Sequence, residues 1–317
     1  MYLGIDLGGT NIAAGLVDDN FNILYKDSIP TRAERTDREI VKDMTLLCKK
    51  VIADYGITQN DVEWIGIGSP GTCDPVNGVL IYTNNIPFKN TPMREWIQDE
   101  IDLPVYINND ANCAALGEAY AGAAKNVDHS VMITIGTGLG GGIIIDKKIY
   151  SGFNGAGAEI GHTCIAVGGD MCNCGRAGCW EVYAAANALK RQTYKAAMEN
   201  VDSQLYKMID GKKENVSGKT AFDAMRGGCP VGTAVVDQYI KYLGAGMVDI
   251  VNVFQPELLI IGGGVCKEGD YLLKPLMDII VAERYSREVP QTKLITAQLG
   301  NDAGIIGAAA LGVGSKQ

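Results

Sequence analysis

The stretch Tyr2-Leu-Gly-Ile-Asp-Leu-Gly-Gly-Thr-Asn-Ile-Ala-Ala-Gly-Leu-Val17 predicts a strand, a tight glycine turn and a second strand. The same pattern recurs at 130–146, where Ser-Val-Met-Ile-Thr-Ile runs through Gly-Thr-Gly-Leu-Gly-Gly-Gly into Ile-Ile-Ile-Asp. One copy in each half of the chain predicts an internally duplicated α/β fold. We expect the two halves to face each other across a nucleotide, with one glycine turn from each half at its phosphates.

The glycine turns are candidate phosphate-binding loops, because glycine lets backbone N–H groups approach phosphate oxygens closely. Asp6, at the end of the first strand, is placed to hold a hydrated Mg²⁺ beside those phosphates. Neither turn is a Walker or dinucleotide motif, since both motifs require a helix directly after the glycines. Taken alone, the first turn is explained equally well as a plain hairpin; the pair is the stronger signal.

A third glycine turn, Gly262–Gly264, follows the buried strand predicted at 257–261 and suits close approach by a base or ribose. A simple strand–helix connection is the alternative interpretation. The residues predicted to bind ATP and Mg²⁺ are Asp6, Gly8, Gly9, Thr10, Asn11, Gly136, Thr137, Gly138, Gly140, Gly263 and Gly264.

Between the two copies, Asn109 and Asp110 stand where the strand Val105–Ile107 gives way to a helix of small residues beginning at Ala111. A helix N-terminus after a strand is a usual place for functional groups in an α/β sheet. The two residues could instead cap the helix, and that role is compatible with a chemical one. Hydrophobic spacing and breakers predict further helices at 36–55, 91–100, 182–226, 230–253, 268–284 and 302–308, with strands at 21–29, 64–68, 79–82 and 293–296.

The stretch Glu159–Glu181 predicts a zinc site. His162, Cys172, Cys174 and Cys179 offer an imidazole and three thiolates, which suit a tetrahedral zinc; four protein ligands leave no open position, so the ion would be structural. Gly175 and Gly178 allow the tight turns that bring the sulfurs together. A carboxylate stands at each end of the stretch, where a closed zinc site would hold both in place to bind a polar ligand. Ordinary buried thiols are the alternative.

Composition excludes several classes. The 317 residues favour two packed domains, and 47% hydrophobic with 21% charged residues is an ordinary globular balance. A net charge of −9 argues against a nucleic-acid surface, and no apolar run approaches the length of a membrane span. Nine cysteines, an odd number, fit a reducing cytoplasm better than a disulfide framework. We therefore expect a cytoplasmic protein without nucleic-acid or membrane partners.

Five motifs together resemble the ROK (repressor, open reading frame, kinase) family over essentially the whole chain. They are Asp6-Leu-Gly-Gly-Thr10, Asn109-Asp110, Gly136-Thr-Gly-Leu-Gly-Gly-Gly142, Glu159-Ile-Gly-His162 and Cys172-Asn-Cys-Gly-Arg-Ala-Gly-Cys-Trp-Glu181. The resemblance implies an actin-like ATPase (ribonuclease H-like) α/β fold with two domains and an interdomain cleft. We place the N-terminal domain at 1–117 plus 303–317, and the C-terminal domain, with the zinc knot and sugar site, at 118–302.

The resemblance further implies ATP-dependent phosphorylation of a hexose, with ATP, Mg²⁺ and a structural Zn²⁺, in a homodimer or homotetramer. The family's zinc ligands correspond to His162, Cys172, Cys174 and Cys179. Its sugar contacts correspond to Gly71, Asn84, Asn109, Asp110, Gly138, Glu159, His162 and Glu181. A sugar hydroxyl is a poor nucleophile, so Asp110 is predicted to accept its proton as the general base.

The run Asn84-Asn-Ile-Pro-Phe88 most resembles the glucokinase branch, so glucose is the expected substrate. Trp180 departs from the smaller aliphatic residue often found at its position, which leaves the exact sugar open. An N-acetylhexosamine kinase, acting on N-acetylmannosamine or N-acetylglucosamine, is the close alternative and depends on space near the sugar C2. A sugar-sensing repressor without kinase activity is disfavoured, because a repressor needs a helix-turn-helix whereas the first strand here begins at Tyr2. A purely structural zinc module would leave Asp110 and the two glycine turns unexplained.

Overall fold

The computed structural model describes residues 1–84 and 86–313, which form two compact units. The first unit comprises Met1–Met132, Gly142–Ala158 and the described residues from Ala297 onward. The second comprises Ile133–Gly141 and Glu159–Thr296. The domain bounds expected from the sequence, 1–117 plus 303–317 and 118–302, stay a prediction; Asn85 and residues 314–317 lie outside the described part.

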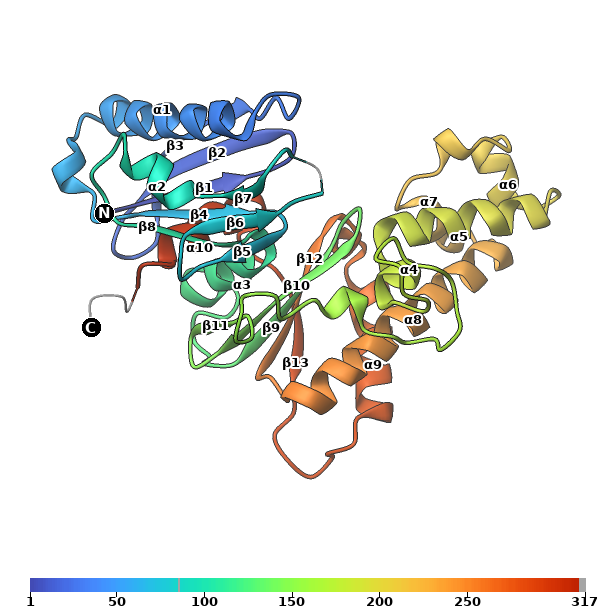
Figure 1. Ribbon diagram of the computed structural model, residues 1–317. Helices are drawn as coiled ribbons and strands as arrows, with labels where there is room; N and C mark the ends of the chain where they lie inside the picture. Colours follow the sequence, from blue (N-terminus) through green and yellow to red (C-terminus); the bar gives the residue numbers. More distant parts are fainter. Residues whose placement is uncertain (85, 314–317) are drawn as a thin grey trace. The chain divides into compact units, whose positions relative to one another are not determined.

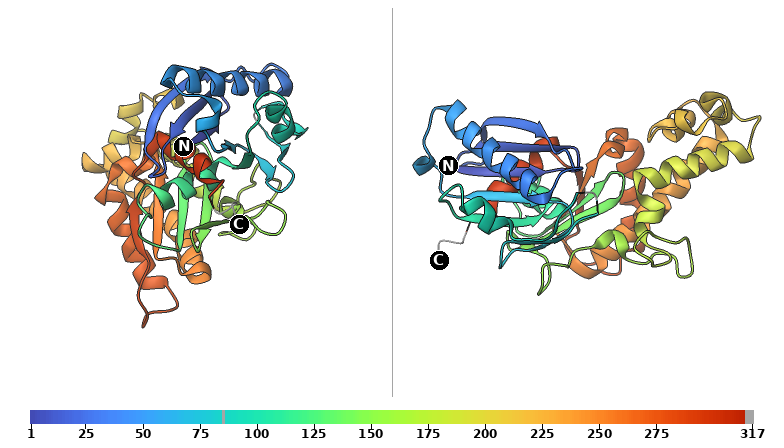
Figure 2. Two further views of the ribbon diagram at one scale, coloured as in Figure 1. Left: turned by 90° about the vertical axis from the view of Figure 1, so that its left-hand side faces the viewer. Right: turned by 45° about the horizontal axis from the view of Figure 1, so that its top comes forward.

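The first unit is built on a five-stranded sheet in the order β3-β2-β1-β4-β8. β1 pairs antiparallel with β2 and parallel with β4, as the predicted strand–turn–strand requires. Figure 1 and the two views of Figure 2 place helix α1 on one face of this sheet and helix α10 on the other. The elements are β1 (Tyr2–Leu7), β2 (Asn11–Val17), β3 (Ile23–Pro30), α1 (Asp37–Tyr55), β4 (Ile65–Ser69), α2 (Met93–Gln98), β8 (Val105–Asn109), α3 (Asp110–Tyr120) and α10 (Ala303–Ala310).

Glycines allow α10 to pack directly on backbone. A Cβ at Gly4 of β1 would lie 1.9 Å from the carbonyl oxygen of Ile305, and one at Gly66 of β4 would lie 1.7 Å from that of Ala308. The partner helix α3 approaches as closely, because a Cβ at Gly307 would lie 1.6 Å from the carbonyl oxygen of Cys113. The last helix, rich in Gly and Ala, thus packs closely on both the sheet and α3. This packing fixes α3, and with it Asp110, against the sheet.

A second five-stranded sheet has the order β11-β10-β9-β12-β13 and repeats the first. β10 and β11 pair antiparallel, as β2 and β3 do, and β12 and β13 pair parallel, as β4 and β8 do. The predicted internal duplication is therefore confirmed. The bounds are β9 (Ser130–Ile135), β10 (Leu139–Ile145), β11 (Lys148–Tyr150), β12 (Leu258–Gly263) and β13 (Lys293–Thr296). The division between the two units falls within β9 and β10.

The helices of the second unit follow the predicted pattern in shorter pieces. The polar stretch predicted as helical at 182–226 is divided between four helices and includes an exposed turn at Lys213–Asn215. The helices are α4 (Trp180–Ala184), α5 (Ala186–Glu199), α6 (Gln204–Ile209), α7 (Thr220–Arg226), α8 (Pro230–Phe254) and α9 (Asp270–Glu283). Among the described residues, no helix is both long enough and apolar enough to cross a membrane.

A small three-stranded sheet of the first unit contains two strands that the sequence did not predict. It joins β5 (Thr72–Asp74), β6 (Val79–Tyr82) and β7 (Lys89–Thr91) in antiparallel pairs. β5 and β7 are three residues long, too short for the alternation of apolar and polar side chains to be visible in sequence. Gly71, one residue before β5, is thereby held at a left-handed φ of 84°.

Candidate functional site

In the first unit, polar side chains gather where the parallel strands β1, β4 and β8 end. The register pairs Asp6 with Gly68, Gly68 with Asn108, and Ser69 with Asn109. Asp110 follows β8 directly as the first residue of α3. The carboxyl ends of parallel strands meet at one edge of a sheet, which is where α/β proteins bind ligands. The sheet therefore brings Asp6, Asn109 and Asp110 to one edge.

Asn109 is the N-cap of α3. Its Oδ1 accepts hydrogen bonds from the backbone N–H groups of Ala111 (2.9 Å) and Asn112 (3.3 Å). Its Nδ2 donates to the carbonyl oxygen of Gly71 at 3.1 Å. A side chain at Gly71 would collide with the backbone, since a Cβ there would lie 2.1 Å from the Tyr82 carbonyl oxygen. Gly71 thus contributes by holding Asn109, a contact between residues 38 positions apart that the sequence did not reveal.

The Asp110 carboxylate is fixed by its own helix, because Oδ1 accepts a hydrogen bond from the Ala111 N–H at 2.8 Å. Burial raises the pKa of Asp110, while hydrogen bonds from Ala111 and Asn109 oppose the rise. Burial, and secondarily the charge of Asp110, raise the pKa of Asp6 from 3.8 to about 6. Two neighbouring carboxylates whose charging is costly are a fitting donor set for a divalent cation, because Mg²⁺ prefers carboxylate oxygens and relieves their repulsion.

The raised pKa of Asp6 predicts a pH-dependent stability change in Asp6→Asn. A folded-state pKa above the unfolded value means that the folded protein binds more protons between about pH 4 and pH 6, so stability falls as pH rises through this window. At pH 8 the ionised Asp6 costs up to about 3 kcal/mol, at about 1.4 kcal/mol per pKa unit. We expect Asp6→Asn to raise the melting temperature at pH 8 by about 5 °C, and to raise it little at pH 4.

Thermal unfolding of both proteins without added divalent cation, followed by circular dichroism at the two pH values, measures this difference. Asp102→Asn is the matched control, because Asp102 is exposed on the same unit. A variant no more stable than the parent at pH 8 would contradict the assigned cost of charging Asp6.

The first glycine turn is exposed at its tip. The Gly8 N–H donates to the Asn11 carbonyl oxygen at 2.9 Å, which closes the hairpin between β1 and β2. Thr31, at the end of β3, supports the turn from behind: its Oγ1 donates to the Gly8 carbonyl oxygen at 2.6 Å and its N–H to the Thr10 carbonyl oxygen at 2.8 Å. Gly9, Thr10 and Asn11 are exposed, which leaves this side of the turn open to a ligand.

The second and third glycine turns come together in the second unit. A Cβ at Gly263, whose φ is 102°, would lie 2.1 Å from the carbonyl oxygen of Ile135, the residue before Gly136. The end of β12 therefore lies directly against the end of β9. Nothing lies within 4 Å of a Cβ built at Gly136 or Gly264, so both positions face open space. The expectation that these glycines share one site is consistent with this geometry.

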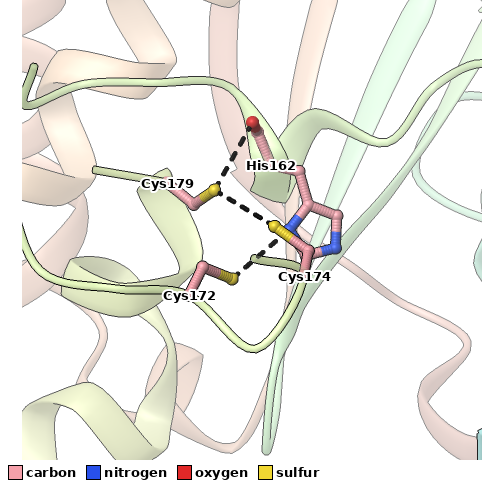
Figure 3. A group of neighbouring side chains, drawn as sticks. All are labelled: His162, Cys172, Cys174 and Cys179. Atoms are coloured by element: carbon pink, nitrogen blue, oxygen red, sulfur yellow. Dashed lines mark hydrogen bonds between the residues drawn. The ribbon is translucent and has the colours of Figure 1, made fainter. Parts of the chain in front are cut away.

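The four predicted zinc ligands form one cluster in the second unit (Figure 3). Their ligand atoms all lie within 4.8 Å of one another. Sγ of Cys172 is 3.6 Å from Nδ1 of His162, and Sγ of Cys174 is 3.6 Å from Sγ of Cys179. Zn–S and Zn–N bonds of about 2.3 and 2.0 Å at tetrahedral angles separate ligand atoms by roughly 3.6–3.8 Å. The cluster fits a tetrahedral zinc, and His162 would use Nδ1.

Glycines shape the zinc loop as the sequence indicated. Gly175 and Gly178 have φ values of 89° and 83°, and a Cβ at Gly178 would lie 1.9 Å from the Ala166 carbonyl oxygen. Cys164, the fourth cysteine of the stretch, is outside the cluster, and its Sγ contacts the Ala177 carbonyl oxygen at 3.8 Å. A non-ligand role for Cys164 was the expectation.

Glu181 links the zinc cluster to the second glycine turn. Its Oε2 accepts a hydrogen bond from the Leu139 N–H at 2.9 Å, and its Oε1 lies 3.9 Å from Sγ of Cys172. A Cβ at Gly138 would lie 2.4 Å from Glu181 Oε2, so a side chain there would displace the carboxylate. The turn that carries Glu159 and His162 lies on the same residue, because a Cβ at Gly161 would lie 2.0 Å from the Leu139 carbonyl oxygen. Leu139 was missed by the sequence analysis, since it acts through backbone groups that no side-chain pattern reveals.

Two predicted sugar contacts, Glu159 and Asn84, are exposed. Glu159 is exposed at the start of the turn that leads to His162. The His162 N–H donates to the Glu159 carbonyl oxygen at 3.1 Å. Asn84 is exposed in a bend after β6, and its neighbour Asn85 lies outside the described residues. The role of Asn84 therefore stays a prediction.

Comparison with known proteins places the chain in a family. The ROK family model matches residues 2–314. The glucokinase of Halalkalibacterium halodurans is 36% identical over 308 residues, covering 96% of this chain and 93% of that protein. The glucokinase of Streptomyces coelicolor is 37% identical over 320 residues, covering 98% and 97%.

A crystal structure of a ROK family glucokinase from Streptomyces griseus, in complex with glucose and AMPPNP, superposes with a TM-score of 0.78. Its sequence is 35% identical, and the alignment covers 98% of each chain. With the duplicated sheets described above, these similarities show the two-domain actin-like ATPase (ribonuclease H-like) fold that the sequence predicted. This chain is a member of the ROK family over nearly its whole length.

Proposed function

We propose that this chain is an ATP-dependent hexose kinase that converts glucose to glucose 6-phosphate. The observation that carries the proposal is Asp110, a partly buried carboxylate with a raised pKa, held by Ala111 N–H at the carboxyl ends of the parallel strands. Two facts support glucose and ATP as the substrates. Glucokinases are 36–37% identical to this chain, and a structural relative was crystallised with glucose and AMPPNP.

In the proposed reaction Asp110 acts as the general base. It accepts the proton of the reacting sugar hydroxyl while that oxygen forms a bond to the γ-phosphorus of ATP, and the bond from this phosphorus to the bridging oxygen breaks to release ADP. The raised pKa makes Asp110 a stronger base than an exposed aspartate.

The remaining predicted residues supply binding. We propose that Asn109, Glu159, His162 and Glu181 hydrogen-bond the sugar hydroxyls, with backbone approach at Gly71 and Gly138 and a further contact from Asn84. The phosphates of ATP would be bound by Gly8, Gly9, Thr10, Asn11, Gly136, Thr137, Gly138 and Gly140, and the base or ribose by Gly263 and Gly264. Mg²⁺, held by Asp6 through water, would neutralise phosphate charge.

We propose that zinc has a structural role. His162, Cys172, Cys174 and Cys179 would hold it, and with four protein ligands it supplies rigidity and no chemistry. All nine cysteines are free, which suits the cytoplasm, and the family resemblance supports a homodimer or homotetramer.

A coupled ADP-release assay tests the function. The purified protein is given ATP and Mg²⁺ with glucose, mannose, fructose, N-acetylglucosamine or N-acetylmannosamine in turn. We expect strong turnover with glucose alone. Turnover only with an N-acetylated sugar would replace glucose by an N-acetylhexosamine, and sugar binding without any turnover would favour a sensor and contradict the kinase mechanism.

A further inference from the structure

Trp180, the largest fully buried side chain among the described residues, lies in the sequence between two polar candidate site residues. It stands between the zinc ligand Cys179 and the carboxylate Glu181, yet its indole is fully buried (0% exposed). The indole Nε1–H donates to the carbonyl oxygen of Tyr242 in α8 at 2.9 Å. The ring therefore points away from the ligand groups on either side of it and into the helices of the second unit.

Gly246 of α8 provides the space for this ring. A Cβ built at Gly246 would lie 2.2 Å from Cε2, 2.3 Å from Cδ2 and 2.7 Å from Cζ2 of Trp180. Glycine in a helix interior is destabilising relative to alanine, and here its lack of a side chain lets the indole lie on the helix backbone. The large Trp180 side chain of α4 thus packs where α8 has a glycine, Gly246.

The short helix α4 depends on tertiary contacts, of which the Trp180 indole on α8 is one. It has five residues, too few for a stable helix by itself. The Trp180 N–H donates to the Thr163 carbonyl oxygen at 2.8 Å, and the Tyr239 hydroxyl of α8 donates to the Ala184 carbonyl oxygen at 2.8 Å. The indole thus attaches the start of α4 to α8, where Cys179 and Glu181 are its immediate neighbours.

The position of Trp180 affects the contacts of the two residues beside it, Cys179 and Glu181. Glu181 Oε2 meets the Leu139 N–H at 2.9 Å, and Cys179 Sγ lies 3.6 Å from that of Cys174. Because both side chains leave the backbone within one residue of Trp180, a shift of the indole moves both. Such a shift of even 1 Å is enough to weaken binding by a directed carboxylate.

We propose that Trp180, seated on Gly246, is a positioning residue that sets Glu181 for hexose binding and Cys179 for the zinc cluster. The hexose part rests on the proposed function, whereas the zinc part does not. Trp180 touches neither the sugar nor the ion. Its effect is expected in the KM for glucose and in zinc retention, with little change in the KM for ATP.

The test compares Trp180→Leu, Gly246→Ala and the double variant with the parent protein. We expect Trp180→Leu to raise the KM for glucose and the rate of zinc transfer to a chromogenic chelator by about tenfold, a typical effect of losing a group that orients ligands. The KM for ATP should stay within about twofold, because only the second of the three glycine turns contacts Glu181, through the Leu139 N–H. Gly246→Ala should act in the same direction, since its Cβ displaces the indole.

The double variant separates positioning from general damage. Leucine at 180 vacates the space that the alanine methyl at 246 then fills, so the two substitutions should compensate in part and the double variant should retain zinc better than either single one. Phe222→Leu is the control for loss of a buried ring, because Phe222 of α7 is also fully buried in the second unit. Should Trp180→Leu fail to fold, Trp180→Phe serves in its place, because it keeps one aromatic ring while losing the bond to Tyr242 and part of the buried volume.

Two results would overturn the inference. One is a folded Trp180 variant with unchanged zinc release and an unchanged KM for glucose. The other is a change no larger than that of Phe222→Leu. Absence of glucose phosphorylation in the parent protein would count against the proposed function instead, and zinc release would still decide whether Trp180 positions Cys179.

Discussion

Asp110→Asn should abolish measurable phosphorylation of glucose while glucose binding is largely kept. Asparagine has the same shape and can still accept the Ala111 N–H bond that aspartate accepts at 2.8 Å, but it cannot take the proton of the sugar hydroxyl. Loss of a general base costs about 10²–10⁴-fold in kcat. Stopped-assay kinetics give kcat, and calorimetric titration gives the dissociation constant for glucose, which we expect to change by less than about fivefold.

Stability gives an independent check on the same variant. Because burial disfavours the charged form of Asp110, the neutral amide should leave the melting temperature unchanged or raise it. Asp37→Asn is a matched control, since Asp37 is the first residue of α1 and loses the same charge at a helix N-terminus in the same unit. A kcat for Asp110→Asn within tenfold of the parent value would remove Asp110 from the base role.

Cys174→Ser should lose zinc and with it the sugar site. The hydroxyl of serine is a poor zinc ligand, and three remaining ligands leave an open coordination position in place of a closed site. Because the ion would join His162 to the cysteines that precede Glu181, its loss frees the loop that carries both. We expect less than about a tenth of the parent zinc content, a melting temperature lower by about 10 °C, and glucose turnover reduced at least about tenfold.

The experiment measures bound zinc by elemental analysis after gel filtration, together with unfolding and turnover. Cys164→Ser is the control, because it makes the same change in the same loop at a cysteine outside the cluster. It should retain zinc and activity. A zinc-free Cys174→Ser protein with full activity would show that the cluster is dispensable for sugar phosphorylation.

The candidate functional groups of the two units differ in how far the sequence could predict them. The zinc ligands lie within 18 residues, and closely spaced cysteines with a histidine have few other uses, so local spacing identified them and the structure brings all four together. Asp110 was found because the strand-to-helix change at 109–110 is also a local signal. Asn84 shows the limit, since the structure leaves it exposed in a bend beside a residue outside the described part.

The sequence alone determined the duplicated sheets, the glycine turns, the helix that begins at Asp110 and the four candidate metal ligands that the structure brings together. Hydrophobic period, turn residues and ligand spacing are all properties of neighbouring residues. Only the tertiary structure decided that Leu139 N–H holds Glu181, 42 residues further along the chain, and that Gly71 holds Asn109. It also decided that Gly246 accommodates Trp180 and that Gly4 and Gly66 admit α10. These contacts join backbone groups and glycines far apart in the chain, and neither a backbone N–H nor a missing side chain leaves a pattern in sequence that names its partner.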